Sequence, residues 1–384
     1  MIKLFRTSTI AASLDTLLKG QLYFLNQYFE VTAISGYDTR LKEVQEREKV
    51  KIHSIEMQRN ISPLKDFVSL LKLYRYFRKE KPTIVHSITP KAGLLTMLAG
   101  KMAGVPIRIH TFTGLIFPSK NGLMQELLIW MDRLLCWSAT HIYPEGNGVK
   151  NDLINYRITS KPLKVIANGN VNGIDLDFFS PTQVSQEHKE RLRQELNISP
   201  YDFVFIFVGR LVGDKGINEL VEAFCNIKIN NLKLLLVGPT EEKLDPLKPE
   251  TIEMIKNNKN IIPVGFQKDV RIYFAISDAL TFPSYREGFP NVVIQAGAME
   301  LPSIVSNING CNEIIQDGKN GLIIPSKNVQ ELKKSMIKLI NDKELHQNLK
   351  QNSRAMIVSR YKQSLVWEAI LEEYQKIINN LERN

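Results

Sequence analysis

Two cations follow an apolar, strand-like run in the segment Phe203–Gly216, which reads FVFIFVGRLVGDKG. The run ends at Gly209, and Arg210 and Lys215 lie in the loop after it. Ligands of open α/β sheets bind at the carboxyl ends of the strands, so we expect both cations to face such a site. An arginine offers a planar fork and a lysine a point charge, a combination suited to a diphosphate. Two unrelated surface cations on a loop are the alternative interpretation.

A second strand-to-helix segment, Phe282–Glu300, has the sequence FPSYREGFPNVVIQAGAME. We expect the strand to end at Ser284 and the helix to begin at Pro290, because proline is pre-organised for the first helical position. The backbone N–H groups of Asn291 and Val292 would then project from the helix start, where anions bind. This segment therefore predicts a second contribution to an anion site.

Two polar side chains of the same segment have the chemistry to contact a hydroxyl-rich ligand. Glu287 lies in the turn before the helix, and Gln295 lies eight residues later, about two helical turns away and close to the same face. A carboxylate accepts hydrogen bonds from hydroxyl groups, and an amide can bind a vicinal diol. A capped helix with surface polar residues explains either side chain alone but not the whole arrangement.

The first half of the chain offers a histidine and a glycine for the same kind of site. The segment Ile107–Gly114 reads IRIHTFTG, and we expect its strand to carry His110 toward the carboxyl end. A structural histidine is the alternative. Gly20 follows the first strand and would permit a close backbone approach to a ligand. No G-x-G-x-x-G motif stands there, which argues against a nicotinamide or flavin dinucleotide.

Metal binding is not indicated by the acidic residues or the cysteines. Asp175 and Asp177 form a D-x-D, a spacing that some sugar-nucleotide enzymes use to hold a divalent metal, but it falls at the expected junction between the two halves. We interpret it as turn chemistry. The three cysteines have no paired spacing typical of a zinc site or a disulfide framework. The sequence therefore predicts no metal and no other cofactor.

The elements that would position these residues are strands alternating with helices. Runs such as FVFIFVG and KLLLVG are apolar on both faces, as in parallel strands covered by helices on both sides. The pattern predicts two doubly wound sheets, with a hinge near Gly169–Pro181. We also expect a strand at Lys164–Ala167 and a final amphipathic helix at Ser364–Leu381.

Composition and charge restrict the class of protein. The 384 residues are 43% hydrophobic and 23% charged, as in ordinary globular proteins, and no apolar run approaches the 18 residues of a membrane-spanning helix. We expect a cytoplasmic protein. Residues 1–180 contain 24 Lys and Arg against 15 Asp and Glu, so the excess of positive charge lies almost wholly in this half. Such a field favours anionic partners, and no nucleic-acid-binding module is recognisable.

The segment Pro63–Pro82 combines an apolar face with six lysines and arginines. A basic amphipathic helix of this kind can lie on an anionic membrane surface. A helix that covers the sheet and turns its polar face to solvent is the alternative for this segment alone. Together with the basic first half, the segment predicts peripheral attachment to the inner face of the cytoplasmic membrane.

Taken together, these motifs resemble the retaining family 4 glycosyltransferases of GT-B fold, in particular the bacterial branch that builds capsule, O-antigen and other lipid-linked glycans. The similar stretches span nearly the whole chain: SLDTLLKGQLYFL, ISPLKDF, IVHSITPKAGLLTMLAGKMAGVPIRIHTFTG, VIANGNVNGIDLDFF, VGRLVGDKG, SYREGFPNVVIQAGAM and NEIIQDGKNGLIIP. Their co-occurrence is far more specific than any single motif.

The resemblance implies a two-domain enzyme with two Rossmann-like domains facing a central cleft. Residues 1–175 would bind the acceptor, residues 176–362 the nucleotide-sugar, and the helix within residues 363–384 would cross back to the first domain. By motif match, the residues at the reacting sugar and its diphosphate are Arg210, Lys215, Glu287 and His110. The other donor-binding positions are Gly20, Gly209, Gly265, Phe266, Gln267, Gly288, Phe289, Asn291, Val292 and Gln295.

The resemblance implies transfer of a hexosyl or N-acetylhexosaminyl group from a nucleoside-diphosphate sugar, a UDP-sugar first of all, to an undecaprenyl-diphosphate-linked glycan. One departure concerns the nucleotide: the family's second acidic residue is Gln295 here, which keeps one acceptor but loses the charge that would hold the ribose diol. Two alternatives remain open at this point. One is a UDP-sugar 2-epimerase of the same architecture, and the other is a non-catalytic relative that binds nucleotide-sugars.

Overall fold

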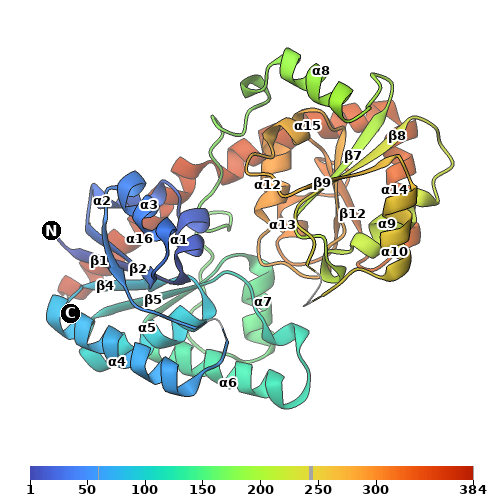
Figure 1. The fold of residues 1–384 in the computed structure, drawn as a ribbon. Helices are drawn as coiled ribbons and strands as arrows, with labels where there is room; N and C mark the ends of the chain where they lie inside the picture. Colours follow the sequence, from blue (N-terminus) through green and yellow to red (C-terminus); the bar gives the residue numbers. More distant parts are fainter. Residues whose placement is uncertain (59, 242–244, 384) are drawn as a thin grey trace. The chain divides into compact units, whose positions relative to one another are not determined.

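The computed structural model describes residues 1–58, 60–241 and 245–383, and it divides into two compact units. Unit 1 comprises Met1–Gly173 and Gln363–Asn384, and unit 2 comprises Ile174–Lys362. The chain therefore enters unit 2 at residue 174 and returns to unit 1 for its last helix. Figure 1 shows this helix, α16, beside the N-terminal helices of unit 1.

Unit 1 is built on a six-stranded sheet in which every pairing is parallel, in the order β3-β2-β1-β4-β5-β6. Its strands are β1 Lys3–Ile10, β2 Glu30–Gly36, β3 Lys51–Ser54, β4 Ile84–Ser87, β5 Ile107–Phe112 and β6 His141–Pro144. Val31, Ile84 and Ile109 are among the buried residues of these strands, and such β-branched side chains pack well on a pleated surface.

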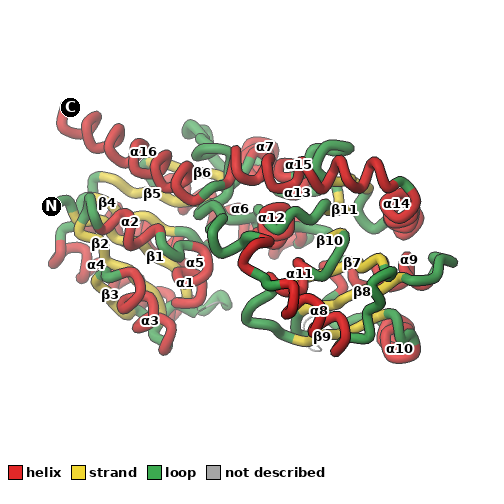
Figure 2. The backbone as a smooth tube through the Cα atoms, turned by 90° about the horizontal axis from the view of Figure 1, so that it is seen from above, coloured by secondary structure: helices red, strands yellow, loops and turns green. Residues whose placement is uncertain are grey.

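Helices cover both faces of the unit 1 sheet, so each face has its own apolar core. They are α1 Ala11–Leu17, α2 Gln21–Asn26, α3 Thr39–Glu48, α4 Pro63–Glu80, α5 Pro90–Ala103, α6 Gly122–Ser138, α7 Asn147–Asn155 and α16 Gln363–Arg383, with the 3-10 turn η1 Phe117–Ser119. The core on one face includes Val366, Ile370 and Tyr374 of α16. Figure 2 shows α16 as a long helix along this unit.

Unit 2 is built on a second six-stranded parallel sheet, in the order β12-β11-β10-β7-β8-β9. Its strands are β7 Phe203–Val208, β8 Leu232–Val237, β9 Ile261–Gly265, β10 Ala279–Phe282, β11 Ser303–Ser306 and β12 Gly321–Ile324. A single large core surrounds this sheet.

The helices of unit 2 lie on both faces of its sheet, as Figure 2 shows. They are α8 Gln186–Glu195, α9 Ile217–Cys225, α10 Pro249–Asn257, α11 Arg271–Ala275, α12 Asn291–Ala298, α13 Cys311–Ile314, α14 Val329–Asn341 and α15 Lys343–Tyr361, with the 3-10 turns η2 Pro181–Gln183 and η3 Gly213–Lys215. Side chains fix some of the helix starts. The Asn328 amide oxygen, for example, accepts a hydrogen bond from the Glu331 N–H at 3.0 Å.

Both sheets have the same strand order when each is counted from its own first strand, namely 3-2-1-4-5-6. The first and fourth strands are adjacent in each: β1 with β4, and β7 with β10. This is the topological switch point, where the connections turn to opposite sides and open α/β sheets bind ligands. The expectation of two doubly wound parallel sheets is confirmed.

Two local expectations have different outcomes. Residues 164–167 are not a strand: the nearest pairing is an isolated bridge between Leu163 and Ile142. The segment lies beyond the sheet edge formed by β6, so it has no second partner with which to build a ladder.

The Asp175 carboxylate accepts hydrogen bonds from the N–H groups of Asp177 (3.1 Å) and Phe178 (2.9 Å), which confirms the turn interpretation. No described helix has both the length and the apolar character needed to cross a bilayer.

Candidate active site

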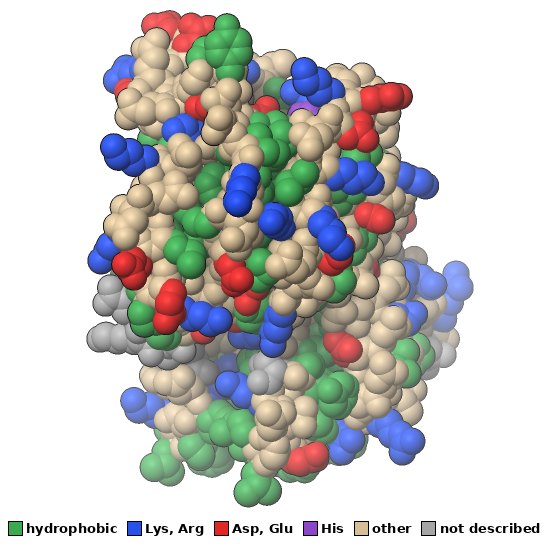
Figure 3. Space-filling view, turned by 90° about the vertical axis from the view of Figure 1, so that its right-hand side faces the viewer, with side chains coloured by type: hydrophobic (Ala, Val, Ile, Leu, Met, Phe, Trp, Pro, Cys, Tyr) green, Lys and Arg blue, Asp and Glu red, His purple; other side chains and the backbone are tan. Residues whose placement is uncertain are grey.

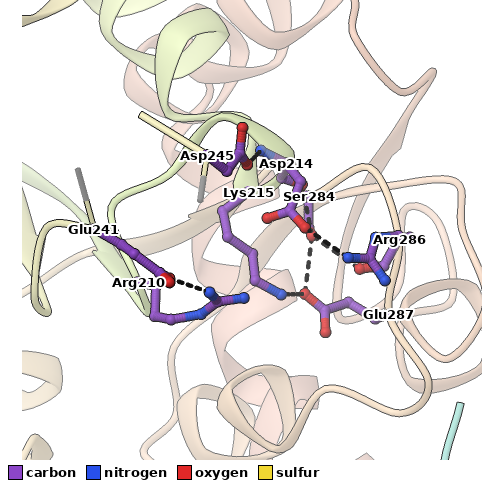
Figure 4. A network of polar contacts seen from close by, with 8 residues as sticks. All are labelled: Arg210, Asp214, Lys215, Glu241, Asp245, Ser284, Arg286 and Glu287. Atoms are coloured by element: carbon purple, nitrogen blue, oxygen red, sulfur yellow. Dashed lines mark hydrogen bonds and ion pairs between the residues drawn. The ribbon is translucent and has the colours of Figure 1, made fainter. Parts of the chain in front are cut away.

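A lysine and a glutamate meet at the carboxyl ends of β7 and β10. Lys215 follows β7, Glu287 follows β10, and their side chains form an ion pair (Figure 4). The Ser284 hydroxyl donates a second hydrogen bond to the same Glu287 oxygen at 2.8 Å. Both charged side chains are largely buried, with 17% and 15% of their surface exposed. The pairing therefore holds a positive and a negative group at fixed positions beside the switch point of unit 2.

A second ion pair stands beside the first and is more exposed. Arg210, directly after Gly209 at the end of β7, pairs with Glu241, which follows β8 (Figure 4). About half of the Arg210 side-chain surface is accessible to solvent. Exposed pairs of this kind contribute little stability, about 0 to 1 kcal/mol, because water and salt screen them. An anionic ligand could therefore displace Glu241 from Arg210 at small cost.

The loop that carries Lys215 is held by acidic side chains. Asp245 accepts a hydrogen bond from the Asp214 N–H at 2.6 Å, and the Asp214 carboxylate pairs with Arg286 at 3.1 Å (Figure 4). The loop after β7 is thereby tied both to the segment after β8 and to the turn after β10. These contacts fix the backbone from which Lys215 projects.

Glycines allow these loops to pack backbone against backbone. Gly216 has φ +73°, and a Cβ there would lie 2.2 Å from the carbonyl oxygen of Pro283. Gly310, after β11, would place a Cβ 2.4 Å from the Gly288 carbonyl oxygen. Real Cβ atoms do not come so close, so a side chain at either position would push the strand-end loops apart.

The start of α12 supplies backbone groups at the same edge. Pro290 is the residue before the helix rather than its first residue, and Asn291 and Val292 form the first turn. The N–H groups of such a turn lack partners within the helix, and this eight-residue helix follows directly on the Gly288–Phe289 turn. The Phe289 side chain itself is buried against Tyr361, so only its backbone is available to a ligand.

The structure places Gln295 on α12, about one helical turn beyond its start. The side chain is partly buried, and its amide makes no hydrogen bond within the described residues. It can therefore reach a bound ligand without breaking an existing contact.

Gly265 is the last residue of β9, the strand beside β8, and Phe266 and Gln267 follow it. Gly265 accepts a hydrogen bond from the Gly238 N–H at 2.8 Å, and Gln267 donates to the Val264 carbonyl at 3.2 Å. The Phe266 ring is 73% exposed. An exposed ring at the carboxyl edge of a sheet is suited to stacking against a flat group such as a base.

His110 lies inside unit 1, two residues before the end of β5. It is 1% exposed, and its Nδ1 is 2.8 Å from the Ser87 hydroxyl on β4. Gly93 leaves the space that the ring occupies, because a Cβ there would be 2.5 Å from His110 Cε1. Burial lowers the pKa of His110 to about 3, so the imidazole is neutral at physiological pH.

Gly20 precedes α2 in unit 1 and is conformationally required. Its φ is +80°, and a Cβ would lie 2.7 Å from the ring of Trp367 on α16. Its N–H donates to the Glu48 carboxylate at 2.9 Å. Gly20 thus lies between α1 and α2 rather than directly after β1 as expected, and it serves the packing of α16 and the contact of this loop with α3.

Unit 1 also contains a buried polar cluster that sequence reasoning missed. Arg6 of β1 is completely buried, and its Nη1 donates to the Tyr374 hydroxyl on α16 (2.6 Å) and to His86 Nδ1 on β4 (2.7 Å). Since Arg6 can only donate, His86 accepts at Nδ1 and carries its proton at Nε2, 2.7 Å from the Thr111 hydroxyl. Burial and the nearby arginine lower the pKa of His86. This cluster ties α16 to the sheet.

Sequence reasoning brought together the residues after β7, β9 and β10 but missed Glu241, Asp245 and Ser284. Glu241 follows β8, so the rule that ligands gather at strand ends was sufficient to find it. The arrangement holds two cations whose carboxylate partners can be exchanged for an anion. It also holds a carboxylate, Glu287, that is oriented by two hydrogen-bond donors. A diphosphate bonded to a hydroxylated group is the ligand that this combination fits best.

Two family models match the chain. The model described as "Glycosyltransferase Family 4" matches residues 23–177, and the model described as "Glycosyl transferases group 1" matches residues 188–356. The chain is 31% identical over 383 residues to the capsular polysaccharide biosynthesis glycosyltransferase CapM of Staphylococcus aureus, covering 99% of this chain and 98% of that protein.

A second relative and a solved structure extend the comparison. The chain is 30% identical to the UDP-Gal:alpha-D-GlcNAc-diphosphoundecaprenol alpha-1,3-galactosyltransferase of Escherichia coli, over 79% of this chain and 78% of that one. Among solved structures, Alr3699/HepE of Anabaena in complex with UDP superposes with a TM-score of 0.81 at 18% identity, covering 98% of this chain and all of that one. This likeness concerns the fold.

Proposed function

The chain belongs to the family 4 glycosyltransferases of GT-B fold, and from that premise we propose that it transfers a sugar from a UDP-sugar to a diphospholipid-linked glycan, with retention of the anomeric configuration. The observation that carries the proposal is the set of strand-end groups in unit 2, in which Lys215 and Arg210 stand beside Glu287. The proposed product is a longer lipid-linked glycan for a surface polysaccharide.

On the donor side, the proposal rests on exchangeable ion pairs. A diphosphate that enters this site would take over Arg210 from Glu241 and share Lys215 with Glu287. The Glu287 carboxylate would then accept hydrogen bonds from hydroxyl groups of the sugar. The N–H groups in the first turn of α12 would face the phosphate. The solved structure of similar fold was obtained with UDP bound, which supports a uridine nucleotide here. Phe266 would stack on its base.

The proposed chemical step breaks the bond between the sugar C1 and the β-phosphate oxygen and forms a bond from C1 to the acceptor hydroxyl oxygen on the same face. Negative charge develops on the departing diphosphate. The proton of the acceptor hydroxyl passes to the β-phosphate oxygen that leaves C1. Lys215 and Arg210 stabilise that charge from fixed positions, and each donor of this kind contributes roughly 3 kcal/mol to lowering the barrier. With two fixed cations in this role, we propose that the step needs no metal ion.

On the acceptor side, the proposal rests on the relatives. The Escherichia coli relative is named for an acceptor in which a diphosphate joins GlcNAc to undecaprenol, and for an alpha-linked product from UDP-Gal. UDP-galactose carries its sugar in alpha linkage, so an alpha product means retention. The Staphylococcus aureus relative is named for capsule biosynthesis. The first name supports a lipid-linked acceptor for this chain, and the second supports a polysaccharide product.

We further propose that unit 1 contacts an anionic membrane surface through α4 and α6. Large apolar side chains are exposed on these helices, most of all Leu64 (85%) and Leu123 (91%). The others are Phe67, Val68, Met124, Leu127, Trp130 and Trp137. Exposed Lys65, Lys72 and Lys120 stand in or beside the same helices. Figure 3 shows hydrophobic and basic side chains together at its lower edge, at the level of α6. Apolar anchors beside cations are typical of interfacial attachment.

The transfer proposal is tested with UDP-, GDP- and dTDP-sugars on a defined polyprenyl-diphosphate sugar. We expect a UDP-sugar to give an alpha-linked product that is one sugar longer. A beta-linked product would contradict retention. An epimer formed from the donor alone would show an isomerase, and donor binding without any product would show a non-catalytic relative.

The membrane proposal is tested by flotation with vesicles that contain phosphatidylglycerol. Leu123→Asp should reduce binding at least tenfold, and added salt should weaken binding of the unaltered protein. Tyr201→Asp, at an 86% exposed position in unit 2, is the matched control and should bind normally. Vesicle binding that changes neither with added salt nor with Leu123→Asp would contradict the proposed surface.

A further inference from the structure

A pocket lies at the carboxyl ends of β4 and β5 in unit 1, outside the groups discussed so far. Its wall is mostly apolar and includes Phe112, Leu115, Phe117, Leu128 and Met131. The polar groups on the lining are the Asp132 carboxyl from α6 and the Lys91 ammonium from α5. Carboxyl ends of parallel strands are where such sheets bind ligands, so this position in the fold favours a functional pocket.

Asp132 stands out as an acidic side chain on a mostly apolar pocket wall. The carboxyl forms no hydrogen bond and no ion pair with any described residue, although it is partly buried in an apolar wall. Burial alone raises the pKa of Asp132 to about 7. Lys91 does not neutralise it, because its ammonium pairs with Asp66 and also donates to the Asn60 carbonyl at 3.0 Å. The Asp132 oxygens are therefore unpaired within the described residues and available to a ligand that enters the pocket.

The apolar wall and the single hydrogen-bond acceptor together indicate which chemical group would fit the pocket. An isoprenoid chain would bury against the wall but leave the Asp132 carboxyl unpaired, which costs free energy. A bare hydroxyl would pair with the carboxyl but leave the wall unfilled. An acetamido group has a methyl group for the wall and an N–H for the carboxyl.

We propose that this pocket receives the acetamido group of the acceptor's sugar, with the amide N–H donating to the Asp132 carboxylate. The inference rests on the proposed function, because it takes the acceptor to be a lipid-linked glycan. It goes further by assigning the choice of acceptor sugar to named residues. The pocket mouth includes Ile61 and Ile116, both exposed, next to the apolar faces of α4 and α6, so an acceptor held at a membrane would reach it from that surface.

The experiment compares two short-chain isoprenoid diphosphates, one carrying GlcNAc and one carrying glucose, as acceptors. Unaltered protein should prefer the GlcNAc compound at least tenfold in kcat/KM. Asp132→Leu removes the oxygen atoms that accept the hydrogen bond. It should lower kcat/KM for the GlcNAc compound about tenfold, which abolishes the preference, and change kcat/KM for the glucose compound less than twofold. Glu126→Leu, at an exposed acidic position of the same helix, is the control and should keep the preference.

A graded variant and a pH series separate recognition from structure. Asp132→Asn keeps an oxygen acceptor but loses the charge, so its preference should be intermediate and independent of pH. In unaltered protein the preference should rise with pH through about 7, as the carboxyl ionises. The other titratable groups near it are Cys136 on α6, whose pKa burial raises, and the Lys91–Asp66 pair. Leu128→Phe fills the pocket and should remove the preference even if the Asp132 variants fold poorly.

Failure of this inference can be told from failure of the proposed function. Transfer to both acceptors with a preference that no Asp132 or Leu128 variant changes would overturn the inference and leave the function intact. If no acceptor is elongated, the proposed function fails. Calorimetric binding of the two compounds then decides the inference: equal affinities overturn it, and tighter GlcNAc binding that Asp132→Leu abolishes supports it.

Discussion

The two sheets have the same strand order but use their first and fourth strands in opposite ways. In unit 2 the charged groups stand after the ends of β7 and β10: Arg210 and Lys215 on one side, Glu287 on the other. In unit 1 the corresponding strands, β1 and β4, carry Arg6 and His86 within the strands, where they are buried. The charged groups of the first and fourth strands therefore stand beyond the strand ends in unit 2, whereas in unit 1 they lie within the strands and Arg6 contacts Tyr374 of α16.

This difference shows that strand order alone does not decide where a ligand binds. A charged residue past the end of a strand remains within reach of solvent and can exchange its partner. A charged residue inside the strand is covered by the next layer, and its hydrogen bonds become part of the fold. Five substitutions test this distinction, from the largest expected effect to the smallest.

Lys215→Met should give the largest loss of activity. It removes a cation that would stabilise the departing diphosphate, so we expect kcat of the folded protein to fall by about 100- to 1000-fold. The change also leaves the largely buried Glu287 carboxylate with Ser284 as its remaining partner, so thermal stability should fall as well. Steady-state transfer assays measure the effect. Lys256→Met, at an exposed position on α10, is the control. Turnover within threefold of normal in Lys215→Met would remove this residue from the reaction.

Gly216→Ala should disturb both stability and donor binding. Its Cβ would collide with the Pro283 carbonyl, and its φ of +73° adds strain, so we expect a loss of about 2 to 4 kcal/mol in the free energy of unfolding. Gly318→Ala separates the two causes, since Gly318 has φ +71° but no atom within 4 Å of the place that a Cβ would take. It should lose only about 1 kcal/mol. Equal losses in urea unfolding would show that the close approach is unimportant.

Tyr374→Phe should lower stability without the loss of activity that we expect for Lys215→Met. It removes a hydroxyl that lies 2.6 Å from Arg6 and 2.5 Å from His86, leaving buried donors and acceptors less well satisfied. We expect a loss of about 1 to 3 kcal/mol in unfolding free energy and an unchanged KM for the donor. Tyr201→Phe is the exposed control. A lower kcat at full stability would mean that the buried cluster takes part in the reaction.

Asp132→Asn should stabilise the folded protein above neutral pH. Burial raises the folded-state pKa of Asp132 to about 7 from 3.8, so folding takes up a proton between these values and the stability falls as pH rises through that window. Asp132 is partly exposed and solvent screens it, so removing the titration should recover only about 1 kcal/mol of this difference at pH 8 and almost nothing at pH 4. Denaturation midpoints at the two pH values provide the measurement. An equal change in stability at pH 8 and at pH 4 would show that Asp132 is not an ionised carboxylate removed from solvent.

Gln295→Glu should give the smallest effect and sharpen the description of the donor site. A carboxylate accepts stronger hydrogen bonds from a ribose diol than an amide does, so we expect the KM for the donor to fall about fivefold. Because the Gln295 amide has no partner in the described chain, stability should hardly change. A higher KM would indicate that the neutral side chain is suited to a different contact.

Much of the unit 2 site could be predicted from local sequence. An apolar run followed within a few residues by a glycine and cations fixes a strand end, a turn and a charged group together, as in FVFIFVGRLVGDKG. The helix after Pro290 follows from a similarly local signal. The complete burial of His110 against Ser87 and Gly93 was not predicted, because β4 and α5, which cover the ring, come from other parts of the chain.

The sequence by itself determined the order of strands and helices, the family, and the groups that stand at the strand ends of unit 2, because these depend on patterns a few residues long. Only the tertiary structure decided that Arg6 meets Tyr374, 368 residues away, and that Asp132 is left without a partner in an apolar wall of the described chain. Whether a polar side chain becomes part of the core or stays available to a ligand depends on what packs over it. That covering layer comes from distant parts of the chain, so no local pattern contains it.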